Sequence, residues 1–138
     1  MGHQSNVYGV IDCFKGRRGE IDADDLNQSA LAALPERDDW PFLVRAMFAT
    51  ASSEHVTIDY TYRSIHFAAS YKEVEFEWAD WLAKFERFLA KVDGMAARVH
   101  LETVLVGDHR YEWLRDTDTV NTWPPRWVFQ GGEREFKI

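Results

Sequence analysis

The residues best suited to chemistry are histidines and a carboxylate on one expected hairpin. His100 and Glu102 alternate along a strand and share a face, and a turn at Gly107 brings His109 toward them. Two imidazoles and a carboxylate are ligands that zinc accepts. In the expected register, however, His109 pairs with Val106, which is too far along the strand from Glu102 for one ion. We therefore predict no metal site and no cofactor, and interpret these residues as polar positions of an exposed strand.

Nucleophiles and phosphate-binding loops are the next candidates. The single cysteine, Cys13, lies in an apolar run, which is typical of a small buried hydrophobe, and no serine occupies a Gly-x-Ser-x-Gly elbow. The basic loop 15–19 lacks the lysine and hydroxyl spacing of a phosphate loop, so we interpret it as an exposed turn. The sequence therefore favours a non-catalytic protein.

Charge is the second guide to function. Sixteen basic and 23 acidic residues give a net charge of −7, which argues against a nucleic-acid partner and would favour encounter with a basic protein. Aspartates at helix starts are also favoured by capping and by the helix dipole, so the acidic groups have two interpretations. Trp123, beside two prolines after a polar loop, is the tryptophan expected to be exposed and to anchor a partner. The candidate partner-binding residues are Asp22, Asp24, Asp25, Asp38, Asp39, Glu73, Glu77, Asp80, Asp116, Asp118 and Trp123.

The strongest structural pattern is an amphipathic helix over residues 70–94. Its apolar residues recur at spacings of three and four, and they are Val74, Trp78, Trp81, Leu82, Phe85, Phe88, Leu89 and Val92. Ser70 and Glu73 have the spacing of a capping box at its start, and Gly94 is expected to stop it.

Two further helices are expected before this one. Asp22 is a candidate N-cap for a short helix with apolar positions up to Leu34, ahead of Pro35. A second helix over residues 38–48, capped by Asp38 or Asp39, would place Trp40 on its core face.

Strand patterns account for most of the remaining chain. Residues 5–14 predict a largely buried strand, and 55–69 alternate with a change of phase near Arg63 that we interpret as a bulge. Residues 97–106 and 109–114 predict a hairpin turning at Gly107, with Val104 opposite Tyr111. A strand at 127–129 precedes an ending that turns back at 131–132 or frays. The predicted fold class is α+β, a mainly antiparallel sheet with helices on one face, in the order β-α-α-β-α-β-β-β.

Size and composition place these elements in one domain. The 138 residues fit a single globular unit, and 46% hydrophobic content excludes extended disorder. The sequence shows neither a secretion signal nor an apolar run long enough to cross a bilayer. With one cysteine, which fits a reducing compartment, we expect a cytoplasmic protein without a membrane partner.

In general character, as a compact acidic α+β domain without signal, catalytic motif or cofactor site, the chain resembles the small cytosolic immunity proteins of bacteria. This resemblance covers the whole chain and implies binding of a toxin domain with a basic surface, whose active site the immunity protein would occlude. The alternative is a small enzyme or ligand-binding domain with a pocket between sheet and helices, lined by Tyr60, Tyr62, Tyr111 and Trp113. A third possibility is a structural subunit that associates through exposed edge strands.

Overall fold

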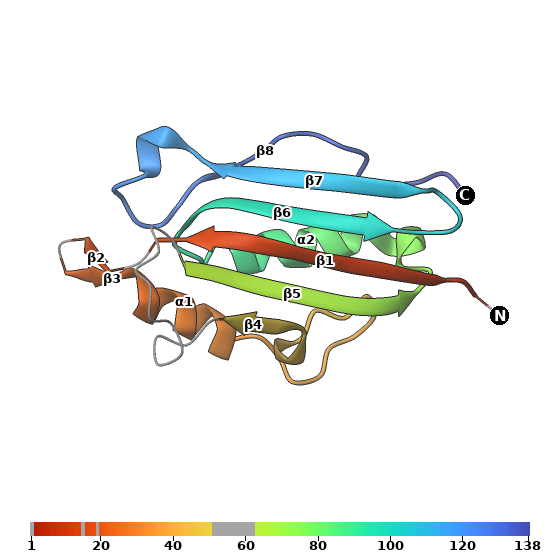
Figure 1. Cartoon of the computed structure of the whole chain (residues 1–138), viewed down its shortest axis with the longest axis horizontal. Helices are drawn as coiled ribbons and strands as arrows, with labels where there is room; N and C mark the ends of the chain where they lie inside the picture. The colour runs from red at the N-terminus through yellow and green to blue at the C-terminus, as the bar shows by residue number, and fades with distance from the viewer. Residues whose placement is uncertain (1, 15, 19, 51–62) are drawn as a thin grey trace.

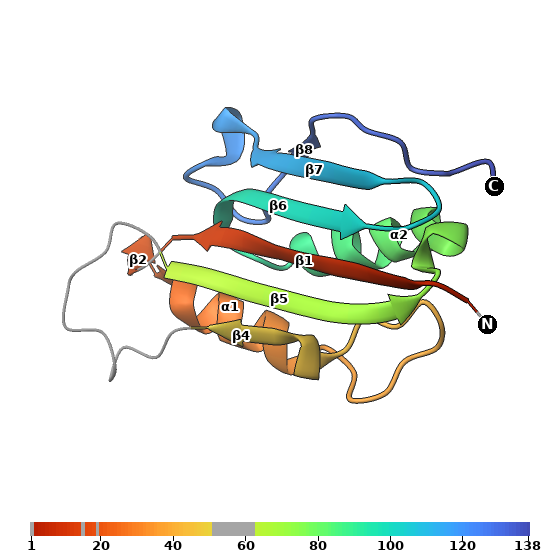
Figure 2. The ribbon, with the colours of Figure 1, turned by 45° about the vertical axis from the view of Figure 1, so that its right-hand side comes forward.

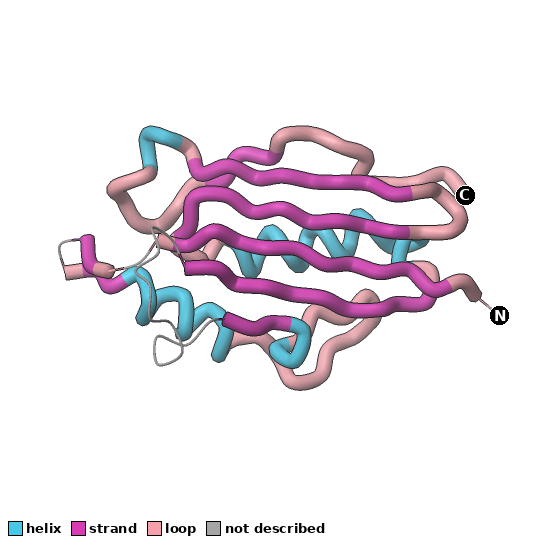
Figure 3. Tube along the Cα trace, in the orientation of Figure 1, coloured by secondary structure: helices cyan, strands magenta, loops and turns pink. Residues whose placement is uncertain are grey.

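An antiparallel sheet organises the chain, of which the computed structural model describes residues 2–14, 16–18, 20–50 and 63–138. Six strands pair in the order β4-β5-β1-β6-β7-β8 (Figures 1 and 3). They are β4 (Phe48–Thr50), β5 (Arg63–Lys72), β1 (Gln4–Cys13), β6 (Gly94–Glu102), β7 (Asp108–Arg115) and β8 (Trp127–Phe129). The short strands β2 (Arg17–Arg18) and β3 (Ile21–Asp22) form a separate pair. Residues 55–62 of the strand expected at 55–69 lie outside the described residues. Residues 63–69 of it belong to β5.

The central strand β1 pairs with β5 on one side and with β6 on the other. Its alternate residues Val7, Ile11 and Cys13 are buried on the inner face, as expected for a strand. Gly9 also belongs to this set, and a Cβ there would come within 2.0 Å of the Arg98 carbonyl oxygen and 2.5 Å of the Phe67 ring. The close backbone approach in the middle of the sheet therefore requires glycine.

The helix α2 (Trp78–Leu89) packs against the inner face of the sheet (Figures 1 and 2). Trp81 stacks between Trp78 at 4.9 Å and Phe85 at 5.4 Å between ring centroids, and Phe85 contacts Trp113 of β7 at 5.1 Å. All eight apolar residues predicted for this helix region are buried, and they form one core with β1, β5, β6 and β7. The predicted amphipathic face is confirmed.

The predicted start of this helix is wrong. Ser70 and Lys72 still belong to β5, and a 3-10 turn, η3 (Val74–Glu77), precedes α2. Glu73 has a φ of 55°, and its carboxylate accepts a hydrogen bond from the amide of His3 at 2.9 Å instead of closing a capping box. The strand extends because Ser70 pairs with Asn6 of β1. Gly94 begins β6, and the helix ends before it at Leu89, with Ala90 as its C-cap.

The helix α1 (Ala23–Ala32) follows its predicted pattern, with Asp22 as N-cap accepting bonds from the amides of Asp24 and Asp25. Asn27 on this helix is buried and exchanges two hydrogen bonds with the backbone of Asp93, at 2.7 and 3.2 Å. These bonds tie α1 to the start of β6.

The helix predicted over residues 38–48 is absent. Residues 38–44 form a loop, followed by the 3-10 turn η1 (Arg45–Met47) and β4. Pro41 lacks an amide proton and disfavours the helical conformation at Trp40, and the Trp40–Pro41 bond is cis. Instead of capping a helix, the Asp38 carboxylate accepts a hydrogen bond from the amide of Leu43 at 3.0 Å and closes the loop.

The predicted hairpin exists, but its register is wrong. Val99 pairs with Tyr111 and Leu101 with His109, so the connection spans residues 103–107 instead of two residues. Thr103 explains the longer turn, since its hydroxyl donates to the Gly107 carbonyl at 2.7 Å and accepts from the amide of Val106. The strand at 127–129 is observed as β8, and residues 130–138 form no strand.

The second face of the sheet carries no helix within the described residues (Figures 1 and 2). The α+β class, the mainly antiparallel sheet and the placement of helices on one face are therefore confirmed. The open face presents the alternate residues of each strand, among them Tyr8 of β1 and Leu114 of β7, which are 38% and 39% exposed.

Candidate functional site

The most exposed tryptophan that the structure describes lies beside α2. Trp40 is 45% exposed, and its ring makes edge contacts with Phe42 at 6.0 Å and Tyr71 at 5.7 Å. Around it is a hollow of about 380 Å³, which we name the Trp40 surface. Its lining residues are Asp38, Asp39, Trp40, Pro41, Asp80, Ala83, Lys84 and Arg87.

The loop that carries Trp40 is joined to the core by hydrogen bonds of Tyr71. The Tyr71 hydroxyl donates to the Phe42 carbonyl at 2.7 Å and accepts from the indole NH of Trp81 at 2.9 Å. Burial raises the pKa of Tyr71 well above its ordinary value, so this hydroxyl stays protonated and remains a donor. These bonds attach the loop that carries Trp40 to the core.

Lys84 of α2 binds the same loop through an ion pair and a hydrogen bond. Its ammonium group lies 2.8 Å from the Asp38 carboxylate and donates to the Asp39 carbonyl at 2.8 Å. Partial burial opposes ionisation of Asp38, but the hydrogen bonds from Lys84 and from the Leu43 amide outweigh it and lower the pKa of this carboxyl. The carboxylates of Asp39 and Asp80 are exposed and form no ion pair within the described part of the chain.

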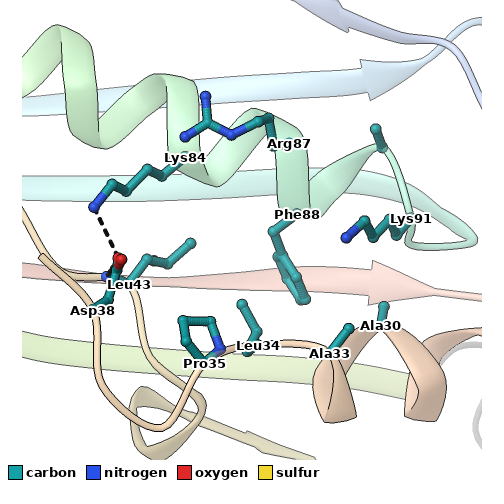
Figure 4. Close-up of a pocket in the computed structure, with 11 residues that line it drawn as sticks. Ala30, Ala33, Leu34, Pro35, Asp38, Leu43, Lys84, Arg87, Phe88 and Lys91 are labelled. Atoms are coloured by element: carbon teal, nitrogen blue, oxygen red, sulfur yellow. Dashed lines mark hydrogen bonds and ion pairs between the residues drawn. The ribbon is translucent and has the colours of Figure 1, made fainter.

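A second hollow of about 430 Å³ adjoins the first and shares Asp38, Lys84 and Arg87 with it; we name it the α1–α2 groove (Figure 4). Phe88 extends from α2 toward Leu34, and Lys91 lies at the far end of the helix (Figure 4). The lining residues are Ala30, Ala33, Leu34, Pro35, Asp38, Leu43, Lys84, Arg87, Phe88, Ala90 and Lys91. The two hollows form one concave surface along α2.

Only part of the predicted acidic set gathers at this surface. Asp38, Asp39 and Asp80 line it, whereas Asp22, Asp24 and Asp25 lie at the start of α1. Asp24 pairs with Arg63 at 3.2 Å. Glu73 lies next to the first strand, and Glu77 is half-buried between η3 and α2.

The remaining predicted residues belong to the loop after β7. Asp116 caps the 3-10 turn η4 (Thr117–Thr119) through the amide of Asp118 and pairs with Arg126 at 2.7 Å. Trp123 is half-buried, so the tryptophan that was expected to be exposed is partly covered. The exposed tryptophan is Trp40, which the sequence pattern places on a core helix face.

The histidine and carboxylate group does not assemble as a metal site. His100 and Glu102 lie on the open sheet face with Tyr8, whose ring stacks on His100 at 5.0 Å and whose hydroxyl donates to Glu102 at 2.8 Å. That hydrogen bond raises the pKa of Tyr8. His109 belongs to the other face and packs on Phe136 at 4.8 Å. In the described part of the chain, no three His, Cys, Asp or Glu residues are placed to hold a metal ion.

Two other predicted sites lie in the core. Cys13 is 2% exposed, and burial, aided by the charges of Asp12 and Asp93, raises the pKa of its thiol to about 12, so it is not a thiolate at neutral pH. Tyr111 and Trp113, expected to line a pocket, are each 1% exposed and packed among aromatic rings. Tyr60 and Tyr62 fall outside the described residues.

The residues that sequence reasoning missed are Trp40 in its exposed position and the cations beside the groove. A Trp-Pro pair after two aspartates was the available signal against a helix there. The groove beside Lys84, Arg87 and Lys91 also needs residues of α1, which is distant from them in sequence.

Comparison with protein-family models, curated proteins and solved structures gives no match for this chain. The longest described helix, α2, has 12 residues, and no described helix combines the length and hydrophobicity that a bilayer crossing needs.

Proposed function

We propose that this chain is a non-catalytic protein-binding protein that binds and neutralises a cognate bacterial toxin domain in the cytoplasm. The observation that carries the proposal is Trp40, a tryptophan 45% exposed and fixed by ring contacts in a hollow with charged walls. Tryptophans of this kind, ringed by polar groups, dominate the binding energy of many protein interfaces.

Charge and rigidity support the same proposal. Asp39 and Asp80 offer unpaired carboxylates beside Trp40, and a net charge of −7 favours encounter with a partner whose surface is basic. The loop needs little ordering on binding, because Lys84 and Tyr71 already hold it to the core. A preformed surface loses less conformational entropy when a partner binds. The acidic α+β character that resembles immunity proteins suggests a toxin as this partner.

The proposal predicts that Trp40→Ala weakens partner binding by at least about 30-fold, the effect of losing a hot-spot tryptophan worth about 2 kcal/mol. The tagged wild-type protein is purified from its native cells at moderate salt, the stoichiometric partner is identified by mass spectrometry, and its Kd is measured by calorimetry. Leu114→Ala, a comparable truncation on the open sheet face, is the matched control and should leave the Kd unchanged. A partnerless eluate, or equal affinities of wild type and Trp40→Ala, contradicts the proposal.

A further inference from the structure

The α1–α2 groove combines an apolar surface with cations on one wall. Leu34, Leu43 and Phe88 form its apolar base, and each is less than 10% exposed. Lys84 and Arg87 of α2 and Lys91, two residues past the end of the helix, all line this groove (Figure 4). The groove is open to solvent along its length, unlike an enclosed pocket for a small molecule.

Two of these cations are available to a ligand. Lys84 is already bound to Asp38 and Asp39, but Arg87 and Lys91 are exposed and make no ion pair or hydrogen bond with another side chain in the described part of the chain. Basic residues near the end of a helix also stabilise its dipole. That effect accounts for their presence on α2 but does not require the apolar groove beside them.

Charge alternates along the concave surface. At the Trp40 end, Asp39 and Asp80 are unpaired, and toward the end of α2 the free charges are positive. The chain has a net charge of −7, but the two free cations make this part of its surface locally positive, next to apolar side chains. A complementary ligand presents carboxylates there, together with apolar groups for the base of the groove.

We propose that the α1–α2 groove binds an acidic, amphipathic segment of the partner protein, with its apolar side chains on Leu34, Leu43 and Phe88 and its carboxylates on Arg87 and Lys91. This inference rests on the proposed function and names the chemistry of the segment that the partner contributes. An amphipathic segment laid in an apolar groove is a common mode of peptide recognition. A nucleic acid is disfavoured as the occupant because the rest of the protein surface repels it.

The test uses two fluorescein-labelled model peptides of equal length with leucines at the same helical positions. One carries glutamate and the other lysine at every polar position, and binding to the full-length protein is followed by fluorescence anisotropy at low salt. The acidic peptide should bind and weaken as salt is added, while the lysine peptide should not bind. No binding of either peptide, equal binding of both, or equally tight binding of a single-stranded oligonucleotide would overturn the inference.

Variants locate the binding to the groove. Arg87→Gln with Lys91→Gln removes both free cations without placing negative charge at the end of α2, and should weaken the acidic peptide about tenfold. Lys72→Gln with Arg110→Gln makes the same change of net charge at exposed positions outside the groove and should have no effect. Ala90→Trp fills the groove without changing charge and should also block the peptide. If the groove variants bind the acidic peptide as tightly as wild type, the inference is wrong.

The two proposals fail in different ways. If a partner is captured through Trp40 but binds the Arg87 and Lys91 variant as tightly as wild type, the groove inference is wrong and the proposed function stands. If no partner is found and the acidic peptide binds as described, the toxin proposal fails and the charge preference of the groove is supported.

Discussion

Replacing Arg115 with leucine is expected to lower the free energy of unfolding by about 3–5 kcal/mol, because it removes the guanidinium that pairs with a buried carboxylate. Arg115 and Asp93 are both fully buried, with 2.9 Å between the guanidinium Nη1 and the carboxylate Oδ1. The same guanidinium donates to the carbonyls of Gly94, Thr119 and Thr122, at 2.8 to 3.1 Å. One side chain therefore joins the start of β6 to the loop after β7.

Urea denaturation followed by tryptophan fluorescence measures this effect. Arg110→Leu, on the same strand but 62% exposed, is the control and should change the unfolding free energy by less than about 1 kcal/mol. The double variant Asp93→Leu with Arg115→Met removes both charges and should recover part of the loss. A loss below about 1 kcal/mol for Arg115→Leu would show that the buried pair does not hold this region together.

Raising the pH above about 9 is expected to destabilise the fold, steeply between pH 10 and 12. Burial raises the pKa of the Cys13 thiol from 9.0 to about 12 and that of the Tyr111 hydroxyl from 10.0 to about 12. Tyr71 is shifted in the same direction. The folded state thus holds these protons more tightly than the unfolded chain, so their contribution is complete below pH 9 and is lost as the pH rises toward 12.

At about 1.4 kcal/mol for each unit of pKa shift, Cys13 contributes roughly 4 kcal/mol across its window and Tyr111 roughly 3 kcal/mol. Urea unfolding at pH 7, 9, 10.5 and 11.5 measures the decline. Cys13→Ala should remove the part that begins near pH 9, because only the thiol has an unfolded pKa that low, and leave the tyrosine part, which begins near pH 10. An unfolding free energy that is constant or rising up to pH 11.5 would contradict the assignment of these groups to the core.

Local sequence patterns predicted the parts of the fold that depend on local spacing. The three-and-four repeat from Val74 to Val92 identified the buried face of α2, and the β-branched run at 5–14 identified the central strand. The start of α2 was mispredicted because Ser70 is used in strand pairing with Asn6, a partner that a local capping pattern cannot reveal. The hairpin register was wrong because the Thr103 side chain stabilises a longer turn than glycine spacing alone suggests.

The candidate site was less accessible to sequence reasoning, because it is assembled from distant segments. Lys84 reaches Asp38 across 46 residues, and Tyr71 supports the Trp40 loop from β5. Three of the predicted acidic residues do lie there, whereas Asp22 and Asp116 act as helix caps. Charge and residue type therefore indicated the kind of surface, while tertiary contacts decided which residues form it.

The most direct test of the central proposal is the growth of cells that produce the captured partner. The partner alone should arrest growth, co-production of the wild-type protein should restore it, and Trp40→Ala produced at the same level should fail to do so. A partner that is harmless on its own, or full protection by Trp40→Ala, would contradict the account.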